Sequence, residues 1–287
     1  MNLLEKYEKY SGYYPLCNEG RKALYSSAEK ICTNDRLVAE ALEFKANLAN
    51  FSCEPEFRQI ENALKGKTVQ FGAFVYTIAI EDMEYIYEQK AIPRKIFDDT
   101  IHDMSVWINR HYSWFGEWGL SEYNWLIGHL RGNLFKLSRL QFETANVSKA
   151  PPDELGLDLK EGDRFLDIHI PRGGRMDEAA CLDSFEQAKE FFPKYLDYDF
   201  KAFGCETWLF DPAFERLLPA DSNILKFQRL FKTYNSYENY DGLKYLFVNI
   251  TKDNIKDAPL DTSFRQAIVK HILSGGIMQS GMGYRLV

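Results

Sequence analysis

The residues best suited to bind an anion form one short loop, which reads Pro171, Arg172, Gly173, Gly174, Arg175 and Met176. Two glycines allow close backbone approach, two arginines add charge, and the helix expected next offers free N–H groups at its N-terminus. This combination is typical of a phosphate or pyrophosphate site. The alternative is an ordinary surface turn, which Asp177 and Glu178 favour, because carboxylates at a helix start satisfy its dipole themselves.

Acid–base chemistry is predicted on the strand expected at 164–170, directly before this loop. Alternation places Asp167 and His169 on one face and the apolar residues between them on the other. A histidine that titrates near neutrality beside a carboxylate is a candidate general base. The alternative is a histidine that is simply hydrogen-bonded at the sheet surface.

Glu143 ends the preceding predicted strand and is expected across a hairpin from Asp167 and His169. Arg131 and Arg139 bracket that strand, and alternation puts Arg139 on the face of Glu143. We expect an Arg–Glu pair there to be structural, with Glu143 as the alternative base.

Other catalytic classes lack their motifs. Cys205 and Glu206 are consecutive in a predicted strand and face opposite ways, so they cannot form a dyad, and no motif supports Cys205 as the nucleophile of a thioesterase-like hydrolase. No HExxH, Walker, GxGxxG or GxSxG motif occurs. The 5 cysteines contain no CxxC pair, which argues against zinc or a disulfide framework, and no metal is expected.

The elements that must position these residues fall into two halves. Up to about residue 131, apolar spacings of three and four predict an all-helical domain of five or six helices and no strand. The main predicted helices are 21–32, 35–50, 69–89, one that begins near Pro93 and continues to 111, and 122–130.

Strands and helices alternate after residue 131. The predicted strands are 134–143, 164–170, 201–210, 243–250 and 283–287, and the predicted helices are 177–192, 213–218, 223–231 and 263–273. A hairpin followed by crossovers predicts a mixed sheet. The predicted fold class is therefore α+β, with an all-α domain at 1–131 followed by a mixed α/β domain at 132–287.

Composition limits the partners. The chain has 287 residues and a net charge of −7, which argues against a nucleic-acid partner. The charged N-terminal segment lacks the apolar core of a signal peptide, and the most apolar run, 71–80, is about half the length of a membrane span. We expect a cytoplasmic protein with reduced thiols and no membrane partner.

Several phrases together resemble one family, at 131–143, 166–171, 208–212, 218–224 and 262–276. They are similar to bacterial acyltransferase-like proteins that join a helical N-acyltransferase N-terminal domain to a C-terminal domain like those of the GNAT N-acetyltransferases. The resemblance implies a GNAT-like fold and an acyl-CoA-dependent transfer, from acetyl-CoA or another acyl-CoA, to an amine of a small-molecule or peptide acceptor.

The resemblance also implies roles for residues. The CoA pyrophosphate would lie on the loop at 171–176, and the pantetheine arm between splayed strands at 164–170 and 201–210, near Phe203 and Cys205. His169 or Glu143 would accept the proton of the amine, and backbone N–H groups near 203–206 would stabilise the tetrahedral intermediate. Tyr234, near the end of a predicted helix, would protonate the leaving thiolate.

The loop departs from the usual GNAT pattern of Arg or Gln, two residues, Gly, one residue, and Gly or Ala. This departure favours a second hypothesis, a catalytically inactive GNAT-like module that binds or senses a small ligand. The polar face of Asp167 and His169 favours the enzyme.

Overall fold

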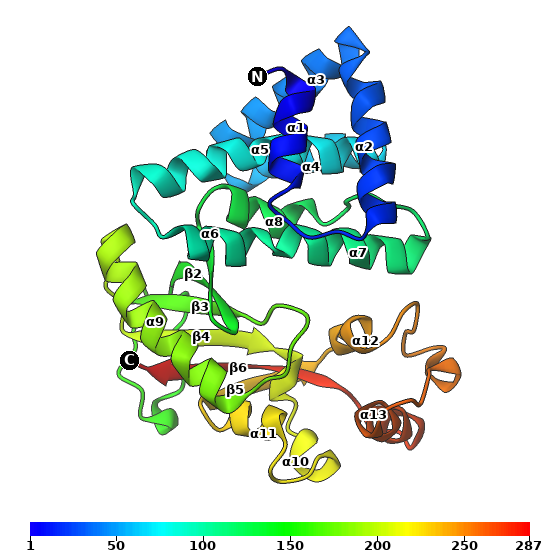
Figure 1. The fold of residues 1–287 in the computed structure, drawn as a ribbon. Coiled ribbons are helices and arrows are strands. Elements are labelled where there is room, and N and C mark those ends of the chain that lie inside the picture. The colour runs from blue at the N-terminus through cyan, green and yellow to red at the C-terminus, as the bar shows by residue number, and fades with distance from the viewer. The chain divides into compact units, whose positions relative to one another are not determined.

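The computed structural model describes all 287 residues and divides into two compact units, Met1–Lys136 and Leu137–Val287 (Figure 1). The first unit contains only helices before the first strand, and the second contains a mixed sheet with helices. The predicted fold class is confirmed.

Eight helices build the first unit: α1 (Leu3–Ser11), α2 (Asn18–Cys32), α3 (Asp35–Asn50), α4 (Glu54–Lys65), α5 (Val69–Gln89), α6 (Arg94–Ile101), α7 (Asp103–Phe115) and α8 (Tyr123–Leu130). Helix α5 is the central one and contacts α1, α2, α3, α4, α6 and α8. Every residue from Phe71 to Ile80 is buried, because a helix surrounded by others has no solvent face.

The predicted count of five or six helices was too low. Helices α1 and α4 were missed, and the helix predicted from about Pro93 to 111 is divided at His102 into α6 and α7. Helix α1 has a clear local signal, since the Asn2 side chain accepts from Glu5 N and the Glu5 carboxylate accepts from Asn2 N. This capping box satisfies two free N–H groups at the helix start.

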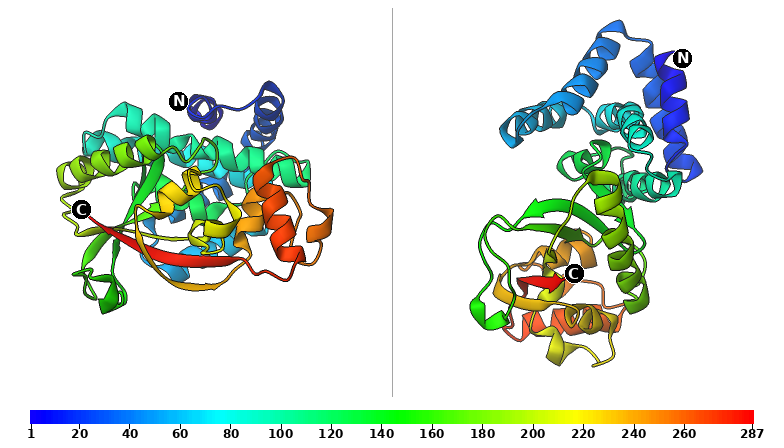
Figure 2. Two further views of the ribbon diagram at one scale, coloured as in Figure 1. Left: turned by 90° about the horizontal axis from the view of Figure 1, so that it is seen from below. Right: turned by 90° about the vertical axis from the view of Figure 1, so that its left-hand side faces the viewer.

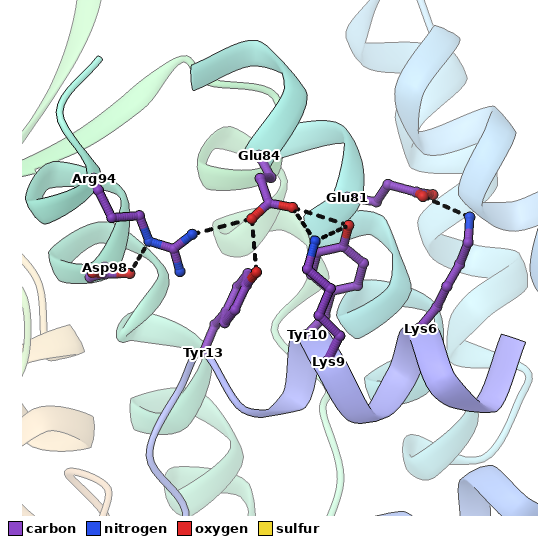
Figure 3. A network of polar contacts seen from close by, with 8 residues as sticks. All are labelled: Lys6, Lys9, Tyr10, Tyr13, Glu81, Glu84, Arg94 and Asp98. Atoms are coloured by element: carbon purple, nitrogen blue, oxygen red, sulfur yellow. Dashed lines mark hydrogen bonds and ion pairs between the residues drawn. The ribbon is translucent and has the colours of Figure 1, made fainter. Parts of the chain in front are cut away.

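A polar network attaches α1 and the residues after it to α5 (Figure 3). The Glu84 carboxylate accepts from Lys9 Nζ at 2.6 Å, Tyr13 Oη at 2.8 Å, Tyr10 Oη at 3.2 Å and Arg94 Nη1 at 3.2 Å. Lys6 pairs with Glu81 at 2.6 Å one helical turn away. A single carboxylate of α5 therefore holds α1, the chain after it and the start of α6.

The sheet has six strands: β1 (Leu134–Leu137), β2 (Leu140–Asn146), β3 (Arg164–His169), β4 (Ala202–Thr207), β5 (Lys232–Glu238) and β6 (Gln279–Leu286). Their order is β1-β2-β3-β4-β6-β5. Strands β3 and β4 are parallel, whereas β2 with β3, β4 with β6, and β5 with β6 are antiparallel. The left view of Figure 2 shows the C-terminal strand β6, in red, along the edge strand β5.

The helices of this unit are α9 (Glu178–Leu196), α10 (Phe214–Leu217), α11 (Asn223–Gln228), α12 (Asp241–Leu246) and α13 (Ser263–Leu273). Helix α9 covers one face of the sheet (Figure 1), where Phe185 packs 4.7 Å from Phe203 and 6.4 Å from Phe142 between ring centroids. A separate core joins α12 and α13 through Leu243, Phe247 and Ile268.

Three strand predictions were wrong. The segment predicted as one strand at 134–143 is a hairpin, since Ser138 adopts a φ of +55° between β1 and β2. Residues 243–250 were predicted as a strand, but the chain forms α12 there. Leu243 on α12 and Phe247 directly after it are both buried, at the spacing of four that a helix gives to one face. Strand β5 was taken for the end of a helix, because it is an exposed edge strand without apolar alternation.

Candidate functional site

The candidate site begins where two parallel strands part. Strands β3 and β4 pair only from Phe165↔Ala202 to Asp167↔Gly204, although β4 continues to Thr207. Beyond this point the Cys205 thiol, rather than a strand N–H group, contacts the Ile168 carbonyl at 3.4 Å. The edge of β4 that faces β3 is therefore without a strand partner from 205 to 207.

The sheet brings three predicted catalytic residues together on one face. Register pairs Glu143 with Asp167 and Gln141 with His169 across β2 and β3. His169 Nε2 lies 3.4 Å from Glu143 Oε2 and 3.8 Å from Asp167 Oδ2. The His169 side chain is 25% exposed and that of Glu143 is 41% exposed, so a substrate can reach both.

Further carboxylates and phenols surround this trio. Burial raises the pKa of Asp167, which the His169 ring opposes and the Glu143 and Glu206 carboxylates reinforce. Tyr237 donates to Glu206 from β5. Sequence reasoning missed Glu206 and Tyr237 as a pair, because β5 itself was not predicted and Glu206 was considered only beside Cys205.

Tyr234 lies on β5, not at the end of a helix as predicted. Its ring stacks on that of Tyr284, with centroids 6.2 Å apart, and the two residues are carried on neighbouring antiparallel strands. Burial raises the pKa of Tyr234, so the phenol keeps its proton at neutral pH.

The predicted anion loop connects β3 to α9. Gly173 and Gly174 adopt φ angles of +87° and +74°, the left-handed region that glycine enters without a Cβ penalty. The backbone N–H groups of 172–176 donate to no group of the protein. Asp177 caps α9 by accepting from Ala180 N at 3.1 Å, so its carboxylate is engaged one residue beyond the loop.

Positive charge comes to this loop from outside it. Ile170, directly before the loop, and Met176, its last residue, pack against the core that contains Phe247 and Ile268. Burial lowers the pKa of Arg172, and the nearby guanidinium of Arg265 on α13 lowers it further. Sequence reasoning missed Arg265, which lies 90 residues further along the chain than Arg175.

The expected Arg–Glu pair is not formed. Arg139 lies in the hairpin turn and donates to the carbonyl oxygens of Pro171 and Arg175 in the loop, while Arg131 donates to the Phe51 carbonyl. The prediction failed because the turn at Ser138 breaks the alternation on which it depended.

Phe203 and Cys205 are buried on the face of the sheet covered by α9, at 1% and 2% exposure. Burial raises the pKa of the Cys205 thiol, and the Asp167 and Glu206 carboxylates reinforce the shift. The thiol is therefore protonated and enclosed, which argues against Cys205 as a nucleophile. Because their side chains are buried, Phe203 and Cys205 can contact a ligand only through their backbone groups at the edge of β4.

No group of three or more His, Cys, Asp or Glu side chains is arranged to hold a metal ion. No helix combines the length and apolar character that crossing a membrane requires.

Comparison with known families gives two matches that divide the chain. A GNAT-like C-terminal domain matches residues 134–285, and an N-acyltransferase N-terminal domain matches residues 15–132. No curated protein matches the chain.

Solved structures of acyltransferases share the fold. One, in complex with decanoyl-CoA, is 20% identical with a TM-score of 0.71, over 95% of this chain and 88% of that chain. Another, in complex with decanoyl-CoA and teicoplanin, is 23% identical with a TM-score of 0.68, over 77% of this chain and 68% of that chain.

Proposed function

Because the chain belongs to the family that joins an N-acyltransferase N-terminal domain to a GNAT-like C-terminal domain, we propose that it is an acyl-CoA-dependent N-acyltransferase. The acyl group would pass from the CoA thioester to an amine of a small-molecule or peptide acceptor. The proposal depends on one observation above all, the parting of β3 and β4 between the anion loop and the Glu143–His169 pair.

Two parts of acyl-CoA have a matching feature in the structure. The free N–H groups of 172–176, with Arg172 and Arg175 beside them, suit the pyrophosphate. The unpaired edge of β4 at 205–207 suits the amide groups of the pantetheine arm, which can pair with a strand edge. The acyltransferase structures that hold decanoyl-CoA support acyl-CoA as the co-substrate.

The chemistry requires one proton acceptor and a stabilised oxyanion. The acceptor nitrogen would attack the thioester carbon, forming the C–N bond, and the proton of the amine would pass to the basic nitrogen of the His169 ring. Glu143 Oε2, 3.4 Å from His169 Nε2, would stabilise the imidazolium that forms. The C–S bond then breaks, and the CoA thiolate leaves and takes up a proton.

The remaining roles stay predictions. Backbone N–H groups near 203–206 would stabilise the tetrahedral oxyanion. Tyr234, whose pKa is raised by burial, would supply the proton to the thiolate. The solved acyltransferase that holds teicoplanin with decanoyl-CoA supports an acceptor of the small-molecule or peptide class.

The alternative is a GNAT-like ligand-binding or sensing module without catalysis. The observation that favours it is the loop sequence, in which Arg172 is followed directly by Gly173 and Gly174 instead of by the spaced glycines of the GNAT pattern. Such a module would bind acyl-CoA without releasing its thiol.

The two functions differ in the response to substitution at His169. We would measure CoA thiol release from decanoyl-CoA with a panel of primary amines that includes amino sugars and peptide N-termini. His169→Ala should lower kcat by about 10²- to 10⁴-fold and leave the Kd of decanoyl-CoA unchanged. Glu143→Gln should lower kcat less, and Glu190→Gln, exposed on α9, should leave it unchanged.

An unchanged kcat in His169→Ala would remove this residue from the mechanism. Tight binding of decanoyl-CoA by the wild-type protein, with no thiol release for any amine, would favour the sensing module.

A further inference from the structure

The turn of the first hairpin is fixed to the helix that follows the anion loop. Arg139 N and Leu140 N both donate to Ser184 Oγ on α9, at 2.9 and 3.2 Å. The same hydroxyl donates to the Ala180 carbonyl at 2.8 Å, within the first turns of α9. The backbone of the turn is therefore held at a set distance from the start of this helix.

From this turn, the Arg139 guanidinium spans the loop. Its Nε donates to the Arg175 carbonyl and its Nη1 to the Pro171 carbonyl, both at 3.0 Å. These two oxygens lie at the two ends of the loop, four residues apart. A planar guanidinium with donors in a fixed fork can bridge two such acceptors, whereas the single ammonium group of a lysine cannot hold them in the same geometry.

The charge of Arg139 has no carboxylate partner among the ion pairs of the protein. Burial lowers the pKa of this guanidinium. Its hydrogen-bond acceptors are two neutral carbonyl oxygens, and the nearby Cys181 thiol is protonated, because burial raises its pKa to about 11. A cation desolvated without a counterion is costly. A bound anion would offset that cost.

The contacts of Arg139 also determine which way the loop presents its polar groups. Two carbonyl oxygens are turned toward Arg139, and the left-handed residues Gly173 and Gly174 between them leave the N–H groups of 172–176 without a protein acceptor. Gly174 lies close to this clamp, since a Cβ built on it would be 4.0 Å from Arg139 Nε. The loop thus holds a run of backbone N–H donors that an anion can bind.

We propose that Arg139 is the positioning residue of the anion loop, which clamps Pro171 and Arg175 so that the N–H groups between them face a phosphate. The inference rests on the proposed function, because the phosphate would be the pyrophosphate of acyl-CoA. Arg139 binds the loop rather than the reacting atoms, so it should affect affinity and not the chemical step.

The test compares ligands with and without the pyrophosphate. We would titrate wild type, Arg139→Ala and Arg139→Lys with decanoyl-CoA, and with decanoyl-pantetheine, which lacks the pyrophosphate. Lys149→Ala, exposed in the same unit, controls for the loss of one positive charge. Circular dichroism and thermal melting would establish that each variant is folded.

We expect Arg139→Ala to weaken decanoyl-CoA binding by about 10- to 100-fold, which is 1.4 to 2.8 kcal/mol, and to change decanoyl-pantetheine binding less than about threefold. Arg139→Lys should recover only part of the affinity, and guanidinium ion at tens of millimolar should partly rescue Arg139→Ala. At saturating decanoyl-CoA, kcat should be unchanged.

Equal weakening for both ligands, or no weakening of decanoyl-CoA by Arg139→Ala, would overturn the inference. Titration with inorganic pyrophosphate separates it from the proposed function. If wild type bound pyrophosphate, Arg139→Ala lost it and neither protein bound decanoyl-CoA, the clamp would stand and the acyltransferase proposal would fail.

Discussion

The carboxylate of Glu84 offers a direct test of how the helical unit is held together (Figure 3). Glu84→Gln preserves the shape of the side chain and removes its charge. An amide oxygen in the place of Oε1 can still accept from Tyr13 and Arg94. The amide NH₂ in the place of Oε2 would point donors at Lys9 Nζ, which Oε2 now binds at 2.6 Å.

The magnitude follows from exposure. The Glu84 side chain is 16% exposed, but Lys9 and Arg94 are 39% and 51% exposed, so water can solvate both cations in the variant. Arg94 also keeps its partner Asp98 at 2.7 Å. The loss should therefore lie between that of an exposed pair and that of a buried pair, at about 1–2 kcal/mol in the free energy of unfolding.

Urea unfolding followed by tryptophan fluorescence measures this loss, because 4 of the 5 tryptophans lie in residues 1–136. The control is Glu88→Gln, an exposed position on the same helix, which should change stability by less than about 0.5 kcal/mol. Equal losses in the two variants would refute the assignment of a stabilising role to the network.

The same carboxylate should make stability depend on pH. Its hydrogen bonds to Lys9 and Tyr13 lower the pKa of Glu84 below its usual value, against the opposing effect of burial. A carboxylate whose pKa is lowered by folding stabilises the folded state fully above its unfolded-state pKa of about 4.3. This stabilisation is lost as the pH falls through the pKa of the folded state. The difference between wild type and Glu84→Gln should therefore shrink from pH 7 toward pH 3. A difference as large at pH 3 as at pH 7 would contradict this assignment.

Two further predictions concern the sheet. Gly204→Ala should lower stability by about 1–3 kcal/mol, because its Cβ would lie 2.5 Å from Phe165 Cε2 and 2.8 Å from Tyr284 Cε1; a melting temperature equal to that of wild type would contradict this packing. Cys205 should resist a thiol reagent such as DTNB at neutral pH until the protein is unfolded, since it is 2% exposed with a raised thiol pKa. Exposed Cys17 and Cys53 should react in the native protein, and rapid labelling of Cys205, located by peptide mapping, would show that the strand opens.

Much of the fold could be predicted from the sequence where local and tertiary signals agree. The helices at 35–50, 69–89 and 263–273 were predicted with the bounds the structure has, because caps and apolar periodicity coincide there. Leu243 to Ile250 was misread because a short apolar run without clear alternation fits strand and helix alike. Strand β5 has little apolar pattern to detect, since nearly all of it is exposed at the sheet edge.

The sequence was enough to predict which residues form the candidate site, but not the contacts that Arg139 and Arg265 make with the anion loop. Alternation was enough to put Asp167 and His169 on one face, and the hairpin order put Glu143 beside them. Arg139 reaches the loop because of the turn at Ser138, and Arg265 lies near Arg172 because of the packing of α13. No local sequence pattern encodes either arrangement. The family resemblance is confirmed by matches over both units.

The most direct test of the central claim is calorimetric titration of the whole protein with CoA, acetyl-CoA and decanoyl-CoA. The account predicts saturable binding at one site, with an affinity that falls as salt concentration rises because arginines and backbone N–H groups hold the phosphates. Absence of binding by all three ligands at low salt would contradict it.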